Sequence, residues 1–274
     1  MLPLGDDNPT FRRPIVTPIL IGLNVLVWIL FQGAGTEEAL VRSTCELGAI
    51  PGELTGKATE DAIQLGPNVV CLLADQPHWY TIVTSMFLHG GWLHLIGNMW
   101  FLWIFGDNVE DSMGRLRFLV FYLLSGVAAA VTHIFTDPAS VLPMVGASGA
   151  IGGVMGAYVV LYPKAPVRLL LILGILITTV RVPAVVMLGY WFLLQVVSGL
   201  PQLSAGEPGG VAFWAHVGGF LTGVALCFVF RNPALVERHR AALAALRQSQ
   251  EWERVRAASP WQHGGRHIPW ERRG

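Results

Sequence analysis

Charged residues are scarce in this sequence, at 13% of its 274 residues. Soluble domains carry roughly 25%, so about half of the expected charge is missing. The loss is local, because apolar runs at or near the roughly 17 to 25 residues that span a bilayer cover most of the chain between residues 15 and 230. This scarcity excludes an ordinary soluble domain and predicts a multi-pass helical membrane protein.

Several sequence motifs are absent as well. The chain has no His-Glu-x-x-His pair for a metalloprotease, no phosphate-binding glycine loop, no dinucleotide fingerprint and no internal repeat. Of its three cysteines, Cys45 and Cys71 lie in one polar segment, where either a disulfide in an oxidising compartment or two free thiols would fit. Cys227 falls in an apolar run and is interpreted as a packing residue.

We expect an all-α bundle of six transmembrane helices, connected mostly by short loops. The expected spans are residues 14–33, 91–109, 117–135, 147–162, 183–200 and 211–230. The first run follows Arg12-Arg13 and could instead be a cleaved signal peptide. Its length and the presence of Asn24 and Trp28 favour a retained helix.

Basic residues gather on one side of this scheme and set its orientation. They precede the first span, separate the second from the third, and follow the fourth and sixth, whereas segment 34–85 is acidic. Cytoplasmic loops are enriched in Lys and Arg. We therefore expect a cytoplasmic segment 1–13, a membrane domain 14–231 with the long loop 34–85 outside, and a cytoplasmic tail 232–274, partly helical and then disordered.

Residues 166–182 do not fit a simple span. A helix running through them into the fifth span would be about 50 Å long at 1.5 Å per residue, well beyond a bilayer core of roughly 30 Å. Two spans would need a tight turn near Pro183, where turn-forming residues are few. We expect an interfacial segment along the inner surface, of undetermined role.

Polar side chains inside apolar spans are functional candidates, because burying them is costly. HLIGN places His94 and Asn98 on one face of the second span, GASG places Ser148 at the start of the fourth, and AHVGG places His216 near the start of the sixth. All three spans run from outside to inside in this topology. These four residues should therefore lie at one depth and form one site.

Small residues indicate how closely these helices approach. The fourth and sixth spans carry glycine pairs that permit near backbone contact, namely Gly149, Gly152, Gly153, Gly219 and Gly223. Close packing would let His216 accept the Ser148 proton and activate the hydroxyl. The Ser148 N–H, Asn98 and His94 could then stabilise an oxyanion.

Other interpretations remain open from the residues alone. Each polar residue could serve helix packing, and a solute transporter would also carry polar groups in its spans. The inner half of the membrane is expected to hold few polar residues beyond Gln195, which sits mid-span, and this scarcity disfavours a transport path. The G-x-S-x-G elbow fits GASG only partly and requires an α/β sheet.

Taken together, three runs resemble the bacterial six-span type of rhomboid intramembrane serine protease. They are MFLHGGWLHLIGNMWFLWIFGDNVEDSMG (Met86–Gly114), GASGAIGG (Gly146–Gly153) and AHVGGF (Ala215–Phe220). The resemblance covers roughly residues 14–231. It implies a Ser148–His216 dyad without a carboxylate, an oxyanion site that includes His94, Asn98 and Gly146, and a structural role for Glu110.

The resemblance also implies partners and location. Substrates would be membrane-embedded, mostly single-pass proteins cut near the outer face. We expect a bacterial cytoplasmic-membrane enzyme that needs no metal or cofactor and binds no nucleic acid, in an undetermined oligomeric state. A rhomboid-like protein of weak or no activity that binds membrane helices is the alternative.

The chain departs from the family pattern at two places. Trp79-Tyr80-Thr81 stands where many relatives have Trp-Arg, and Gly152 stands where relatives often carry an aromatic residue against the catalytic histidine. His216 must then be held in another way.

Overall fold

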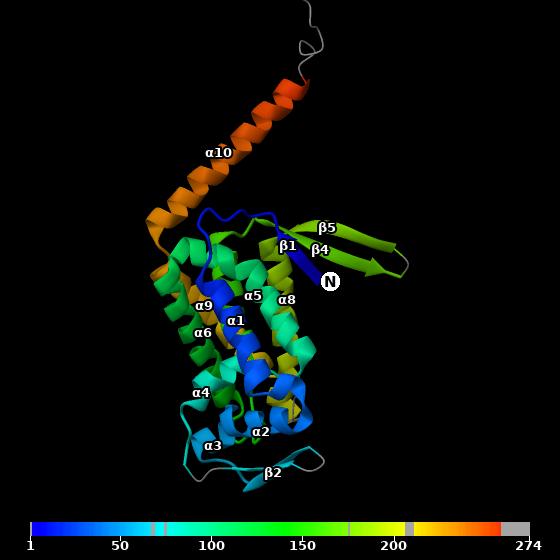
Figure 1. The fold of residues 1–274 in the computed structure, drawn as a ribbon, viewed down its shortest axis with the longest axis vertical. Helices are drawn as coiled ribbons and strands as arrows, with labels where there is room; N and C mark the ends of the chain where they lie inside the picture. Colours follow the sequence, from blue (N-terminus) through cyan, green and yellow to red (C-terminus); the bar gives the residue numbers. More distant parts are fainter. Residues whose placement is uncertain (1, 67–68, 74–75, 175, 206–210, 259–274) are drawn as a thin grey trace, which may run out of the picture.

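The protein is mostly helical in its computed structural model (Figure 1), which describes residues 2–66, 69–73, 76–174, 176–205 and 211–258. Six helices coincide with the six expected spans. They are α1 (Val16–Leu30), α5 (Trp92–Met113), α6 (Arg115–Thr136), α7 (Ser148–Leu161), α8 (Ala184–Ala205) and α9 (Phe213–Phe230). The helical part of the expected fold is therefore present.

Length and composition separate these six helices. Among the described residues, α6, α8 and α9 are long and apolar enough to cross a membrane, whereas α1 and α7 are apolar but shorter. Helix α5 has 22 residues and carries Asp107, Glu110 and Asp111 toward its end. The described part of the chain is thus an apolar helical protein in which three helices are long and apolar enough to span a membrane, and the count of six spans stays a prediction.

Helix α7 is the central element of the bundle. Most of its residues are buried, and its neighbours include α5, α6 and α9. Its contact with α9 is close because glycines meet backbone: a Cβ added at Gly219 would lie 2.0 Å from the Gly149 carbonyl oxygen, and one at Gly223 would lie 2.0 Å from that of Gly153. Such distances leave no room for a side chain.

The expectation of an all-α fold is wrong in detail, because two small sheets flank the bundle. In the first, β1 (Leu2–Asp6) pairs antiparallel with β4 (Pro166–Leu173), which pairs with β5 (Leu176–Pro183). Segment 166–182 is therefore a β-hairpin, and Gly174, at φ +63°, begins its turn. Runs rich in Leu, Ile, Val and Thr suit strands, and the first strand supplies a third partner.

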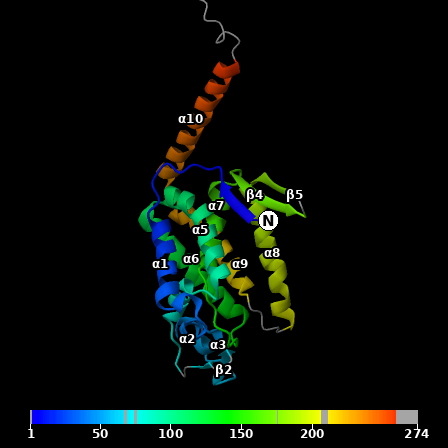
Figure 2. The same ribbon diagram turned by 45° about the vertical axis from the view of Figure 1, so that its right-hand side comes forward.

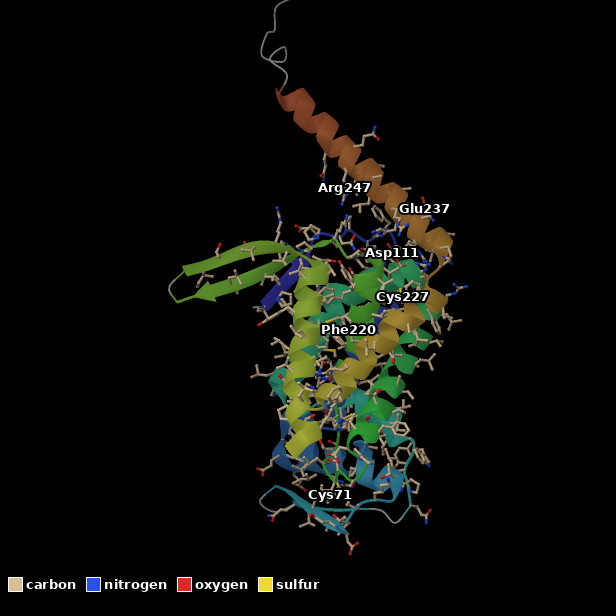
Figure 3. All side chains as sticks on the ribbon, turned by 180° about the vertical axis from the view of Figure 1, so that it is seen from behind. Cys71, Asp111, Phe220, Cys227, Glu237 and Arg247 are labelled. Atoms are coloured by element: carbon tan, nitrogen blue, oxygen red, sulfur yellow. A yellow bond between two sulfur atoms is a disulfide. The ribbon has the colours of Figure 1, made fainter. Side chains whose placement is uncertain are left out.

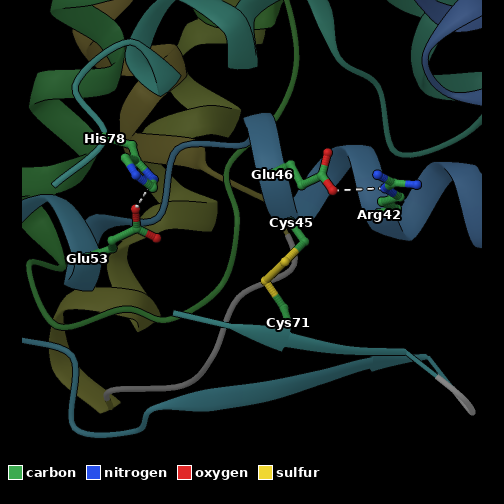
Figure 4. The surroundings of a disulfide bond; sticks show 6 residues. All are labelled: Arg42, Cys45, Glu46, Glu53, Cys71 and His78. Carbon is green, nitrogen blue, oxygen red and sulfur yellow. Dashed lines mark hydrogen bonds and ion pairs between the residues drawn. A yellow bond between two sulfur atoms is a disulfide. The ribbon is translucent and has the colours of Figure 1, made fainter. Parts of the chain in front are cut away.

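The second sheet lies at the other end of the bundle. There, β2 (Ala62–Gly66) pairs with β3 (Val69–Leu72), next to α2 (Glu37–Leu47) and α3 (Pro51–Thr55). A disulfide joins Cys45 of α2 to Cys71 of β3 (Figure 4). Of the two alternatives that the sequence left open, a disulfide or two free thiols, the structure has the disulfide. The short helix η1 (Gly33–Gly35) precedes α2, and α4 (Thr81–Thr84) and η2 (Ser85–Phe87) lie between β3 and α5.

Helix α10 (Pro233–Ala258) projects from the end that carries β1, β4 and β5, opposite α2, α3 and β2 (Figures 1 and 2). Viewed from behind, Glu237 and Arg247 lie at one end of the molecule and Cys71 at the other (Figure 3). The arginine-rich and acidic segments thus occupy opposite ends. The tail is helical to Ala258, and its expected disordered part, residues 259–274, lies outside the described residues.

Candidate active site

Ser148 is the first residue of α7, and the backbone before it is shaped by Gly146. Gly146 has φ +130°, which side-chain-bearing residues rarely adopt, and its N–H donates to the Ser85 carbonyl at 2.9 Å. A Cβ at this position would lie 2.8 Å from Nε2 of His94. Glycine therefore allows His94 to approach the serine loop closely.

His216 lies within hydrogen-bond distance of Ser148. The two atoms are Nε2 of His216 and Oγ of Ser148, 2.7 Å apart. His216 is in the first turn of α9, and the glycine contacts between α7 and α9 bring this turn against the start of α7. The distance lies within the range expected for a nucleophile and its base.

A third side chain contacts this pair from α8. Oε1 of Gln195 lies 2.8 Å from Nδ1 of His216, and Trp191, one turn earlier on α8, has its ring centroid 5.9 Å from the imidazole. Neither residue was predicted to belong to the site. The signal was present, since Trp191 and Gln195 are four residues apart and share a helix face, but the α8 register against His216 is not visible in sequence.

His94 and Asn98 lie on the same side of the site, both on α5. Nδ1 of His94 accepts a hydrogen bond from the Gly90 N–H at 3.2 Å, and Nδ2 of Asn98 donates to the His94 carbonyl at 3.0 Å. The His94 Nε2 edge faces Gly146. The second amide hydrogen of Asn98 is not used by the His94 contact.

These side chains surround one cavity of about 360 Å³. Helices α5, α7, α8 and α9 contribute to its walls. The polar residues among its lining are Ser85, His94, Asn98, Ser148 and His216, and the apolar remainder includes Leu93, Phe101 and Trp191. A mainly apolar cavity with a few convergent polar groups is the usual form of a ligand site.

The five predicted packing glycines lie at helix contacts, although not all against the same helix. Gly152 faces α9, where an added Cβ would lie 3.1 Å from the His216 carbonyl oxygen. Gly149 and Gly153 face α6, against Ala129 and Ser125 at 2.5 and 2.4 Å. Their carbonyls meet Gly219 and Gly223 of α9, so α7 is closely packed on two sides.

Glu110 lies at the far end of α5 from this cavity, at the start of α1. Its carboxylate accepts hydrogen bonds from the N–H groups of Ile15, Val16 and Thr17, and from the Thr17 hydroxyl, at 2.8 to 3.0 Å. It therefore caps α1 from another helix. This contact agrees with a structural role.

Comparison with known proteins finds matches across most of the helical bundle. Residues 76–233 match the rhomboid domain family. The chain is 27% identical to RHOMBOID-like protein 5 of Arabidopsis thaliana over 83% of this chain and 73% of that protein. It is 29% identical to rhomboid protease GluP of Bacillus subtilis over 78% of this chain but only 35% of that protein.

A third relative has a similar identity over a shorter stretch. The chain is 30% identical to putative rhomboid protease YdcA of Bacillus subtilis, over 56% of this chain and 66% of that protein. The family match covers more than half of the chain and includes Asn98, Ser148 and His216. This chain belongs to the rhomboid family of integral membrane proteins, whose members include intramembrane proteases.

Proposed function

We propose that this protein is a serine endopeptidase that hydrolyses peptide bonds of membrane-embedded substrates, with Ser148 as nucleophile and His216 as general base. The observation that carries the proposal is the 2.7 Å contact between Ser148 Oγ and His216 Nε2 at the wall of a cavity. Membership of a family with named proteases supports it.

The first half of the reaction acylates the serine. Ser148 Oγ attacks the substrate carbonyl carbon while its proton passes to Nε2 of His216. The carbonyl oxygen becomes an oxyanion, for which the Ser148 N–H, the free Asn98 amide hydrogen and the His94 Nε2 edge are the available donors. Collapse of the tetrahedral intermediate breaks the C–N bond, and His216 returns its proton to the leaving amine.

The second half releases the other product. Water attacks the acyl carbon and His216 takes the water proton. Collapse of the second tetrahedral intermediate breaks the bond between this carbon and Ser148 Oγ, releases the carboxylic acid product, and returns the proton from His216 to Oγ. The cavity must therefore admit water. Three of its polar residues, His94, Ser148 and His216, lie near the starts of α5, α7 and α9, which the proposed topology puts toward the outside.

The proposed substrate class is the one that the family resemblance implies. Transmembrane segments of mostly single-pass proteins would be cut near the outer membrane face. We place the protein in a bacterial cytoplasmic membrane. The charge distribution supports an orientation with both termini inside, because the arginine-rich elements lie at the α10 end and the acidic segment at the other.

A fluorophosphonate probe tests this function without knowledge of the substrate. The wild-type protein in detergent should be labelled, and Ser148→Ala and His216→Ala should not be. Equal labelling of all three proteins would contradict the proposal. A membrane-anchored reporter in liposomes should yield product with the wild type and none with Ser148→Ala.

A further inference from the structure

We propose that Gln195 is the positioning residue of the dyad: a neutral amide that fills the place a carboxylate takes in a serine–histidine–aspartate triad. This inference rests on the proposed function. The contact between Gln195 Oε1 and His216 Nδ1, at 2.8 Å, lies on the side of the imidazole opposite Ser148. Both ring nitrogens of His216 are therefore partnered, each by a residue from a different helix.

The orientation of the Gln195 amide fixes the direction of these hydrogen bonds. Its Nε2 donates to the Trp191 carbonyl at 3.4 Å within α8, which turns Oε1 toward His216. An amide oxygen only accepts, so Nδ1 of His216 must carry the hydrogen. In the neutral ring Nε2 is then unprotonated, and it faces Ser148 Oγ. This is the tautomer that a general base requires.

The same amide oxygen remains useful after proton transfer. When His216 has taken the Ser148 proton, both ring nitrogens carry hydrogen and the ring is positively charged. The Nδ1–H bond to Gln195 then becomes a charge-assisted hydrogen bond, which is stronger than its neutral counterpart. Gln195 therefore favours the state that accompanies the tetrahedral intermediate more than the resting state, which is the condition for a gain in rate.

Trp191 supplies the aromatic contact to His216 that Gly152, which has no side chain, cannot make. Gly152 leaves no side chain of α7 against the imidazole, and its backbone approaches His216 closely, with an added Cβ only 3.1 Å from the His216 carbonyl oxygen. The Trp191 indole lies instead 5.9 Å from the imidazole at 38°, and 6.2 Å from Phe220. The aromatic wall of His216 thus comes from α8 rather than from α7.

One face of α8 therefore both contacts and orients the base. The i, i+4 spacing of Trp191 and Gln195 means that a rotation or shift of α8 removes both contacts together. Helix α8 is also the least enclosed of the three long apolar helices. In its apolar stretch 17% is buried inside the protein, against 44% for α6 and 39% for α9. The orientation of His216 accordingly depends on where the most exposed of these helices sits.

The test measures the rate of serine phosphonylation at several probe concentrations. In this reaction a bond forms between Ser148 Oγ and phosphorus, fluoride leaves, and the serine proton passes to His216. Gln195→Met keeps the length of the side chain, Gln195→Leu is one atom shorter, and both lose the amide acceptor. We expect the maximal labelling rate to fall about 10- to 100-fold, with an unchanged probe concentration for half-maximal rate.

Two further variants separate positioning from packing. Gln195→Glu keeps an oxygen at the same reach and should restore the rate to within a few-fold of wild type. Gln202→Leu removes the other glutamine of α8, whose Nε2 donates to the Val211 carbonyl at 2.8 Å, and should label as the wild type does. Wild-type rates in Gln195→Leu and Gln195→Met, or an equal loss in Gln195→Glu, would overturn the proposal.

Failure of this inference is distinguishable from failure of the proposed function. If labelling requires Ser148 but is indifferent to residue 195, the protease assignment stands and only the role of Gln195 is refuted. If wild type and Ser148→Ala label alike, the protease assignment itself is refuted, whatever the Gln195 variants do.

Discussion

The Glu110 carboxylate satisfies three successive backbone N–H groups at the start of α1, groups that have no partner within their own helix. Glu110 is itself buried, at 3% exposed. Because a buried donor without a partner costs about 1–3 kcal/mol, we expect Glu110→Ala to lower stability by at least about 2 kcal/mol. Thermal unfolding in detergent measures this loss.

The control for Glu110 is a carboxylate without such contacts. Glu37 lies exposed in the first turn of α2, and Glu37→Ala should unfold close to the wild-type temperature. A melting temperature for Glu110→Ala equal to that of Glu37→Ala would show that the cap contributes little.

The close contact between α7 and α9 leaves no room for a side chain at Gly219. A methyl group there would approach the Gly149 carbonyl oxygen to 2.0 Å, and carbonyl backbone cannot rotate away as a flexible side chain can. We expect Gly219→Ala to separate α7 from α9, to cost about 1–3 kcal/mol or more, and to abolish probe labelling because His216 moves from Ser148. Gly22→Ala in α1, with nothing within 4 Å of the added Cβ, is the matched control.

Strand β1, outside the expected spans, contains a carboxyl group with a shifted pKa, that of Asp6. Burial raises the pKa of Asp6 to about 6, against a hydrogen bond donated by the Tyr158 hydroxyl that lowers it. The unfolded chain ionises this carboxyl near 3.8. Between these values the folded state binds more protons, so stability falls as pH rises from about 4 to about 6.

This pH dependence has a direct measurement. Hydrogen exchange of β1 amides, corrected for intrinsic pH effects, should show less protection at pH 6.5 than at pH 4.5. In Asp6→Asn the side chain cannot ionise, and the difference should disappear. A difference of the same size in Asp6→Asn would assign the effect to another group.

The disulfide acts on the elements at the other end. It joins Cys45 to Cys71 across a sequence separation of 26, and closing a loop of that length in the unfolded chain stabilises by about 3–4 kcal/mol in the chain-entropy model. Cys71 packs with Ile50 and Ile63 in a cluster separate from the main core. We therefore expect the loss to stay local.

The corresponding experiment replaces both cysteines by serine. Hydrogen exchange in β2 and β3 should rise, while the phosphonylation rate at Ser148 should remain that of the wild type. A large fall in that rate would mean that the outer region and the cavity are coupled more tightly than their separate clusters indicate.

For the molecule as a whole, apolar periodicity and short motifs predicted the helices well. Each expected span has a helix, and Ser148, His216, His94 and Asn98 line one cavity, because long apolar segments and a shared depth are properties that sequence carries directly. The prediction for segment 166–182 missed its strands, because β4 and β5 pair with each other and β4 also pairs with β1, a partner more than 150 residues away that the sequence does not reveal. Gln195 was missed for the same reason, since its role depends on helix register rather than on spacing.

The exposed position of α8 has a practical consequence for enzymology. A helix with so little of its surface covered by protein is covered by lipid or detergent, and on the proposal made for Gln195 that helix orients the general base. The surrounding amphiphile then belongs to the kinetic description of the enzyme, and rates measured in micelles of different chain length are not replicates of one another.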